Sequence, residues 1–71
     1  MKGLDVLYTY DYIGAIIQRL TAKRQYLNVS QISRDTGVSR AIISSLMNGE
    51  RVNTSFENVV TLYKFLDDNR I

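Results

Sequence analysis

The chain has 71 residues, 45% hydrophobic and 23% charged, which suits one small globular domain and is far from a disordered composition. It contains no cysteine and no histidine, which excludes disulfides, thiol chemistry and the commonest metal ligands. No cofactor or metal is expected, and no small-molecule ligand is evident. The net charge is only +2, but six basic and two acidic residues fall between residues 19 and 51. Such a concentration of positive charge fits a polyanionic partner or a solvated face, and charge alone does not separate the two.

The sequence predicts neither a membrane-spanning segment nor a signal peptide. The longest uncharged runs reach about half of the ~20 residues that a membrane-spanning helix requires. We therefore expect a cytoplasmic protein without a membrane partner. Residues 1–9 combine β-branched and aromatic side chains without clean alternation, which predicts an irregular N-terminal arm.

A first helix is predicted from about residue 10 to residue 24, after a cap at Asp5 or Thr9. Its apolar positions recur at i, i+3, i+4 and i+7, which is the spacing of a helix with one buried face. Basic residues at its end suit the negative pole of the helix dipole. The apolar positions are Ile13, Ile16, Ile17 and Leu20.

A second helix is predicted over residues 29–36, because cap and stop residues bracket this segment. Asn28 can accept a hydrogen bond from the first turn, and Gln31 is placed to bind the N–H of Asn28 in return, as in a capping box. Gly37 has no Cβ, so it can adopt the left-handed conformation that often ends a helix.

A third helix is predicted over about residues 40–48, with Ser39 as its cap and Gly49 after its end. The turn that joins it to the second helix is short, which is typical of a helix-turn-helix. Helical spacing places Ile43 and Leu46 toward the core. The opposite face is therefore free for a partner.

The last helix is predicted over residues 54–66, and a capping box of Thr54 and Glu57 opens it. Its apolar stripe is wide enough to cover more than one surface. Residues 67–71 form a polar tail that is expected to fray. These assignments predict an all-α fold in a single domain of residues 1–71.

The middle of the chain holds a spaced motif, Ile32-Ser33-x-x-Thr36-Gly37-Val38-Ser39-x-x-x-Ile43-Ser44-x-Leu46-x-Asn48-Gly49. It resembles the helix-turn-helix of the Cro and phage-repressor (Xre-like) family, and the likeness extends over residues 13–66. The resemblance implies a compact, lambda-repressor-like bundle of four or five helices around a central helix-turn-helix. It also implies a homodimer that binds a near-palindromic DNA operator and regulates transcription in a bacterium or a phage-infected cell.

Four positions depart from the family pattern. Val29 stands where the family frequently has a Gln that helps to hold a phosphate and a base-reading side chain. Ser33 replaces a small Ala, Met47 replaces a frequent Glu, and the usual proline before the last helix is absent. The fold tolerates these changes, whereas the phosphate contact at the start of the second helix loses its Gln.

The outward face of the third helix carries side chains suited to DNA base edges, since the major groove admits one helix. Arg40 can donate two hydrogen bonds to the O6 and N7 of guanine, or it can contact a phosphate or solvent. Ala41 can meet a thymine methyl. Ser44 and Ser45 can donate to or accept from bases, or they simply fill the helix surface. Ile42 either touches thymine methyls or packs sideways, and packing is favoured.

Phosphate contacts are expected from polar and basic residues around the third helix, because charge and N–H groups at helix starts bind phosphate. Lys23 or Arg24 can add distant contacts, whereas Arg19 is expected to be a solvated surface residue. Asn48 has an alternative role at the end of its helix. The expected phosphate ligands are Ser30, Arg34, Ser39, Asn48, Arg51 and Asn53.

A homodimer is expected because one monomer of this size reads too few base pairs for useful specificity. The dimer surface is predicted at the last helix and the tail, from Leu62, Phe65 and Ile71. An alternative is the tyrosine-rich arm around Tyr8, Tyr10 and Tyr12, although covering the core is the simpler role and is favoured for Tyr12.

The sequence admits three rival functions. An enzyme is not expected, because the chain has no histidine and little bulk for a sheltered cleft. A protein-binding helix-turn-helix, such as an antitoxin or an anti-regulator, normally carries an extra segment for its target, and a DNA-packaging subunit can share the fold. The favoured function is a small Cro-like repressor, and this ranking rests on family analogy.

Overall fold

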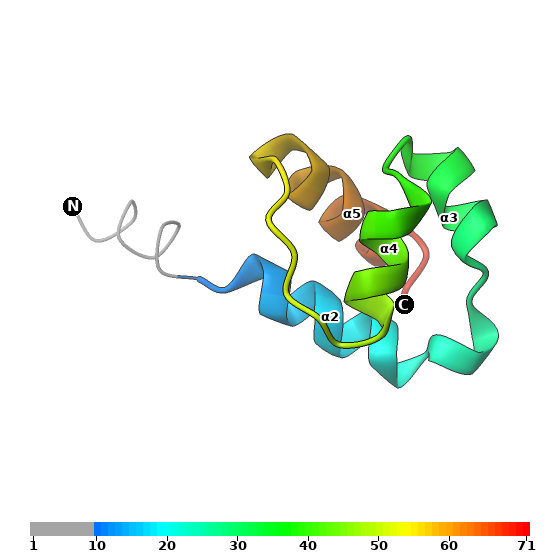
Figure 1. The fold of residues 1–71 in the computed structure, drawn as a ribbon. Coiled ribbons are helices and arrows are strands. Elements are labelled where there is room, and N and C mark those ends of the chain that lie inside the picture. The colour runs from blue at the N-terminus through cyan, green and yellow to red at the C-terminus, as the bar shows by residue number, and fades with distance from the viewer. Residues whose placement is uncertain (1–9) are drawn as a thin grey trace.

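The computed structural model describes residues 10–71, in which helices are joined by short loops (Figure 1). The all-α prediction is confirmed, since residues 10–71 contain no strand. None of these helices has the length and apolar character that a bilayer crossing needs. The predicted arm, with Asp5, Tyr8 and Thr9, lies outside the described residues. The elements are α2 (Tyr12–Ala22), the 3-10 helix η1 (Arg24–Tyr26), α3 (Val29–Thr36), α4 (Arg40–Met47) and α5 (Phe56–Asp68).

One apolar core lies between the four α-helices. α3 packs on α4, and α2 packs on both α4 and α5, so each helix buries one face. Figure 1 shows α2 along the base of the molecule, with α4 and α5 above it. No buried polar or charged residue interrupts this core within the described part of the chain. The buried residues are Ile16, Leu20, Ile32, Val38, Ile43, Leu46, Met47, Val59, Leu62 and Leu66.

The turn between α3 and α4 is held by two hydroxyl groups as well as by a glycine. Gly37 has a φ of 77°, the left-handed conformation that was expected there. Ser33 Oγ donates to the carbonyl of Val38 at 2.7 Å, and Thr36 Oγ1 accepts from the N–H of Val38 at 3.2 Å. Because Val38 is buried, its backbone groups need these partners. Ser33, which departs from the family pattern, is therefore part of the turn.

The caps of α3 and α4 agree with the prediction, apart from one hydrogen bond. Asn28 Oδ1 accepts from the N–H of Gln31 at 3.0 Å, and Ser39 Oγ accepts from the N–H of Ile42 at 3.3 Å. The reciprocal half of the first capping box is wrong. The Oε1 atom of Gln31 accepts instead from Arg34 Nη2 at 2.9 Å, and a charged donor makes the stronger hydrogen bond.

The first helix is shorter than the predicted residues 10–24. α2 begins at Tyr12 because the side chain of Asp11 accepts from the N–H of Gly14 at 2.9 Å and so caps the helix. Beyond Ala22 the chain continues into η1.

The start of α5 also differs, and the predicted capping box of Thr54 and Glu57 is wrong. Ser55 is the cap, since its Oγ accepts from the N–H of Asn58 at 3.2 Å. Thr54 Oγ1 accepts instead from the side-chain Nδ2 of Asn58 at 2.8 Å. Two neighbouring hydroxyl residues therefore share one asparagine at this helix start.

The C-terminal residues dock on α2, contrary to the predicted frayed tail, and α5 extends to Asp68. Arg19 Nε donates to the carbonyl of Ile71 at 2.7 Å, and its Nη1 pairs with Asp67 Oδ1 at 2.8 Å. The same guanidinium lies 5.5 Å from the ring centre of Tyr63. Arg19 therefore links α2 to α5, and the prediction of a solvated surface residue is wrong.

Candidate nucleic-acid interface

The outer face of α4 gathers the residues that were expected to contact bases. Arg40, Ala41 and Ser44 are exposed, and Ser45 is half-buried. These positions follow one another at i, i+1, i+4 and i+5, which places them on one side of the helix. Ser39 caps this helix and is itself exposed beside that face. The surface they form is small, polar and positively charged at its N-terminal end.

Two neighbouring positions of α4 belong to the core instead. Ile42 is half-buried and packs against the core, as favoured from the sequence. Met47, which stands where the family frequently has a Glu, is 6% exposed. Met47 is therefore not free to lie against a ligand of the outer face, and Ile42 uses part of its side chain to pack on the core.

α3 carries two of the predicted phosphate ligands, Ser30 and Arg34, which lie one helical turn apart. Ser30 is half-buried and Arg34 is exposed. Arg34 Nη2 donates to Gln31 Oε1 at 2.9 Å, and Gln31 Nε2 donates to both carboxylate oxygens of Asp35 at 3.2 Å. Val29, where the family frequently has a Gln, packs against the core. Arg34 is thus held in place by a neighbouring side chain on its own helix.

The loop between α4 and α5 carries Asn48, Arg51 and Asn53, all exposed. The N–H of Asn48 donates to carbonyls in the last turn of α4, so its alternative role at the helix end is confirmed. Arg51 forms two hydrogen bonds to Asp11, from Nη2 to Oδ1 at 2.7 Å and from Nη1 to Oδ2 at 3.1 Å. This ion pair, which the sequence did not indicate, ties the loop to the start of α2.

The ion pair shifts the pKa of both partners. Hydrogen bonding from Arg51, and then from the N–H of Gly14, lowers the pKa of Asp11 from 3.8 to about 2. The hydrogen bond to Asp11 in turn raises the pKa of Arg51. Both side chains are more than half exposed, at 62% for Arg51 and 56% for Asp11, so solvent screens the pair. A phosphate near Arg51 must share its guanidinium with this carboxylate.

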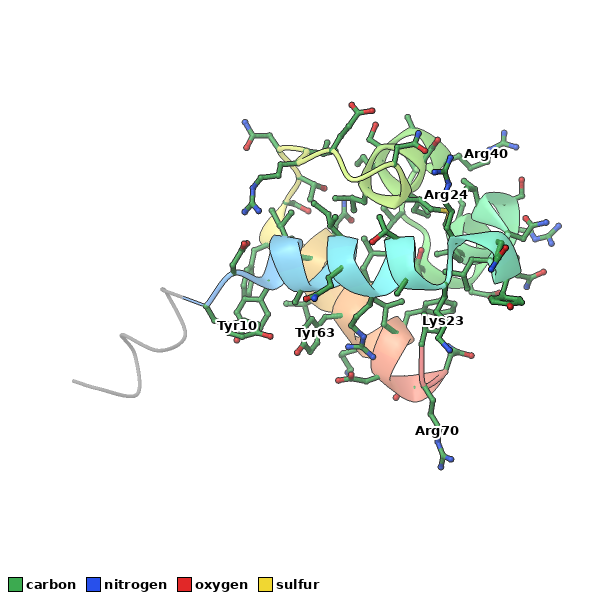
Figure 2. The ribbon with its side chains drawn as sticks, turned by 90° about the horizontal axis from the view of Figure 1, so that it is seen from below. Tyr10, Lys23, Arg24, Arg40, Tyr63 and Arg70 are labelled. Carbon is green, nitrogen blue, oxygen red and sulfur yellow. The ribbon has the colours of Figure 1, made fainter. Side chains whose placement is uncertain are left out.

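Figure 2 shows the labelled basic residues on two sides of the molecule. Arg24 projects toward the same side as Arg40, whereas Lys23 and Arg70 project from the opposite side. Arg24 belongs to η1, the 3-10 helix after α2. Of the two distant contacts considered from the sequence, Arg24 is therefore the one that lies toward the outer face of α4.

Comparison with models of protein families, with curated proteins and with solved structures finds no match. The likeness to the Cro and phage-repressor family stays a prediction from the motif of residues 32–49.

The carboxylates of the described part do not form a metal site. Within residues 10–71, no three histidine, cysteine, aspartate or glutamate residues lie close enough together to hold an ion. Asp11 and Asp67 are each engaged by an arginine, Arg51 and Arg19 respectively. Both carboxylates hold a basic side chain in place, and Asp11 also caps the start of α2.

The predicted dimer surface needs a correction. Leu62 is 0% exposed and lies in the core, so it is not available to a second chain. Phe65 and Ile71 are half-buried and pack against the same core. The apolar side chains that α5 does expose are Phe56, at 73%, and Val60, at 38%. The wide apolar stripe of α5 therefore places Leu62 in the core and leaves Phe56 and Val60 at the surface.

Proposed function

We propose that the chain binds double-stranded DNA through the outer face of α4 and acts as a small Cro-like transcriptional regulator. The observation that carries the proposal is the division of α4 into a wholly apolar inner face and an outer face of Arg40, Ala41, Ser44 and Ser45. A helix that enters the major groove must be free on one side and firmly packed on the other.

The outer side chains have complementary roles in this proposal. Arg40 donates two hydrogen bonds to the O6 and N7 of a guanine, which is worth about 1–3 kcal/mol of discrimination. Ala41 meets a thymine methyl, while Ser44 and Ser45 donate or accept without holding the helix away from the bases. Small side chains at three of four positions allow the backbone of α4 to approach the groove closely.

Phosphate contacts surround this helix and fix its register on the duplex. Ser30, Arg34 and Ser39 lie at the entry to α4, and Asn48 and Asn53 lie in the loop beyond it. Arg24 adds a basic group on the same side. Arg51 contacts a phosphate only in exchange for part of its ion pair with Asp11, so its contribution is smaller than that of an unpaired arginine.

Repression and a near-palindromic operator follow from the family resemblance. Two copies would place their α4 helices in successive major grooves, about 34–36 Å apart. A protein-binding role is the less favoured alternative, because the exposed side chains of α4 are polar or small and include no apolar anchor.

Selection of bound duplexes from a random pool tests this proposal. We expect enrichment of a near-palindromic sequence and an affinity that falls steeply with salt, because phosphate contacts release counterions. Binding without enrichment would favour an architectural or packaging role. Absence of any salt-dependent binding would falsify the proposal.

A further inference from the structure

Three arginines of residues 10–71 donate hydrogen bonds to another side chain, and their partners differ in charge. Arg19 and Arg51 each meet a carboxylate. Arg34 instead donates from Nη2 to the amide oxygen of Gln31 at 2.9 Å. A carboxylate offsets the positive charge of an arginine, whereas a neutral amide oxygen orients the guanidinium and leaves its charge in place. Arg34 is therefore oriented by a partner that does not neutralise it.

The amide group of Gln31 is fixed from its other end as well. Its Nε2 donates to both carboxylate oxygens of Asp35, at 3.2 Å each. Because a guanidinium only donates and a carboxylate only accepts, a single orientation of the amide satisfies Arg34 and Asp35 together. Carboxylate, amide and guanidinium thus form a hydrogen-bonded series on the exposed side of α3.

Helical spacing explains why the amide lies between these two charges. Arg34 and Asp35 are adjacent in the sequence, and residues at i and i+1 of a helix do not face each other. Gln31 lies three residues before Arg34 and four before Asp35, so it is within reach of both. Asp35 therefore fixes the amide, while the ion pairs of residues 10–71 involve Arg19 and Arg51.

We propose that Gln31 is a positioning residue of the DNA interface, which holds the guanidinium of Arg34 in place for a phosphate while Asp35 holds Gln31. The proposal rests on the proposed function. Only Nη2 of Arg34 is used by Gln31, so the other N–H groups of its planar fork are available to phosphate oxygens. A side chain that is already ordered loses less entropy on binding. Gln31 thus raises the affinity without touching DNA itself.

The order of the Arg34 side chain in the free chain is the first measurement. Gln31→Ala should release the guanidinium, so NMR relaxation of the Arg34 Nε–H group should show a more mobile side chain with no DNA present. Gln18→Ala is the matched control, because Gln18 is also an exposed glutamine within a helix, but it lies on α2. This control should leave Arg34 unchanged, and circular dichroism should show both variants folded.

Affinity for the selected duplex is the second measurement. Gln31→Ala should weaken binding by about threefold, because the ordering of Arg34 must then occur on binding. The charge of Arg34 is kept, so the dependence on salt should stay the same. In an Arg34→Ala background, Gln31→Ala should have no further effect. Such non-additivity would not arise if Gln31 only stabilised its helix.

A change of charge at the same position separates orientation from neutralisation. Gln31→Glu gives Arg34 a carboxylate partner, which keeps the guanidinium ordered but offsets its charge. The slope of log affinity against log salt should therefore become shallower. Gln18→Glu adds the same negative charge on α2 and should change the slope less. Equal changes in the two variants would contradict a phosphate contact by Arg34.

Four further results would overturn the proposal. The first is an Arg34 side chain that is equally mobile in the parent chain and in Gln31→Ala. The second is equal affinity of these two chains for the selected duplex, and the third is a loss from Gln31→Ala that persists without Arg34. These three results leave the proposed function standing. The fourth is a parent chain that binds no duplex, which overturns the proposed function as well, so the two failures are distinguishable.

Discussion

α4 and α5 bury similar apolar faces and expose very different ones. The outer face of α4 is basic at its first residue and small and polar beyond it, whereas α5 exposes Phe56 and Val60 beside a cavity lined by tyrosines. Small polar side chains let a hydrated, charged surface such as DNA approach the helix. Exposed aromatic side chains gain most from a partner that excludes water. In this molecule the inner faces build the bundle, and the outer faces differ in the kind of partner that they suit.

The largest effect is expected from Arg40→Ala, which should change the base preference of DNA binding. Arg70→Ala is the control. Both arginines are exposed, but Figure 2 shows that they project from opposite sides of the molecule. Arg40→Ala should relax base preference at one position of the site, at a cost of about 1–3 kcal/mol for the preferred duplex. Arg70→Ala should leave the preference intact. Titration of both variants against the selected duplex and its single-base variants provides the measurement.

A smaller effect is expected from the turn that presents α4. Ser33→Ala removes the hydroxyl that donates to the buried carbonyl of Val38, so it should lower the free energy of unfolding by about 1 kcal/mol. Ser44→Ala is the matched control, since it changes the same residue type on the exposed side of α4. Any gain in helix propensity from alanine is common to both. Urea unfolding should show a lower midpoint for Ser33→Ala, and equal midpoints would argue against the role of this hydroxyl.

Local signals in the sequence were sufficient for α3 and α4. Asn28 and Ser39 are polar caps with extended backbones, and Gly37 is the residue that the left-handed turn favours. These preferences act within a few residues, so a sequence reveals them. The bounds of α3 and the start of α4 were predicted correctly for this reason, as was the set of side chains on the outer face of α4.

The errors concern contacts that depend on how distant elements pack. Arg51 meets Asp11 across 40 residues, and Arg19 meets the carbonyl of Ile71 across 52 residues. No local sequence pattern predicts pairs between residues so far apart. Leu62 was misplaced because the apolar stripe of α5 covers more than half of the helix, so periodicity alone does not tell which part is buried. At the start of α5, two adjacent hydroxyl residues offered equal caps.

Arg51, in the loop between α4 and α5, offers a graded test of the proposed phosphate contacts. Arg51→Ala should weaken binding to all duplexes similarly, and it should reduce the slope of log affinity against log salt by less than the change of about 1 that a full phosphate contact gives. Asp11→Asn should strengthen binding to all duplexes, because it releases Arg51 from a carboxylate. The gain should vanish when Asp11→Asn is combined with Arg51→Ala. A gain that persists in the double variant would mean that Asp11 acts through its own charge.

The smallest expected effect is the pH dependence of the same ion pair. Since the pKa of Asp11 falls from 3.8 to about 2 on folding, its contribution to stability is present above pH 3.8 and is lost as the pH falls toward 2. The stability difference between the parent chain and Asp11→Asn should therefore be constant near neutral pH and shrink in this acidic window. Arg51→Gln should reduce this pH dependence, because the guanidinium is the main cause of the shift. Chemical unfolding at a series of pH values measures both.

The central claim is that α4 meets DNA through its outer face, and an NMR titration of the isotope-labelled chain with the selected duplex tests it most directly. The account predicts that the largest amide shifts fall on residues 39–48, with a further shift of the Arg40 side-chain Nε–H, and that Phe56 and Val60 shift less. It also predicts that added salt reverses these changes. Shifts centred on α5, with residues 39–48 unaffected, would contradict the account.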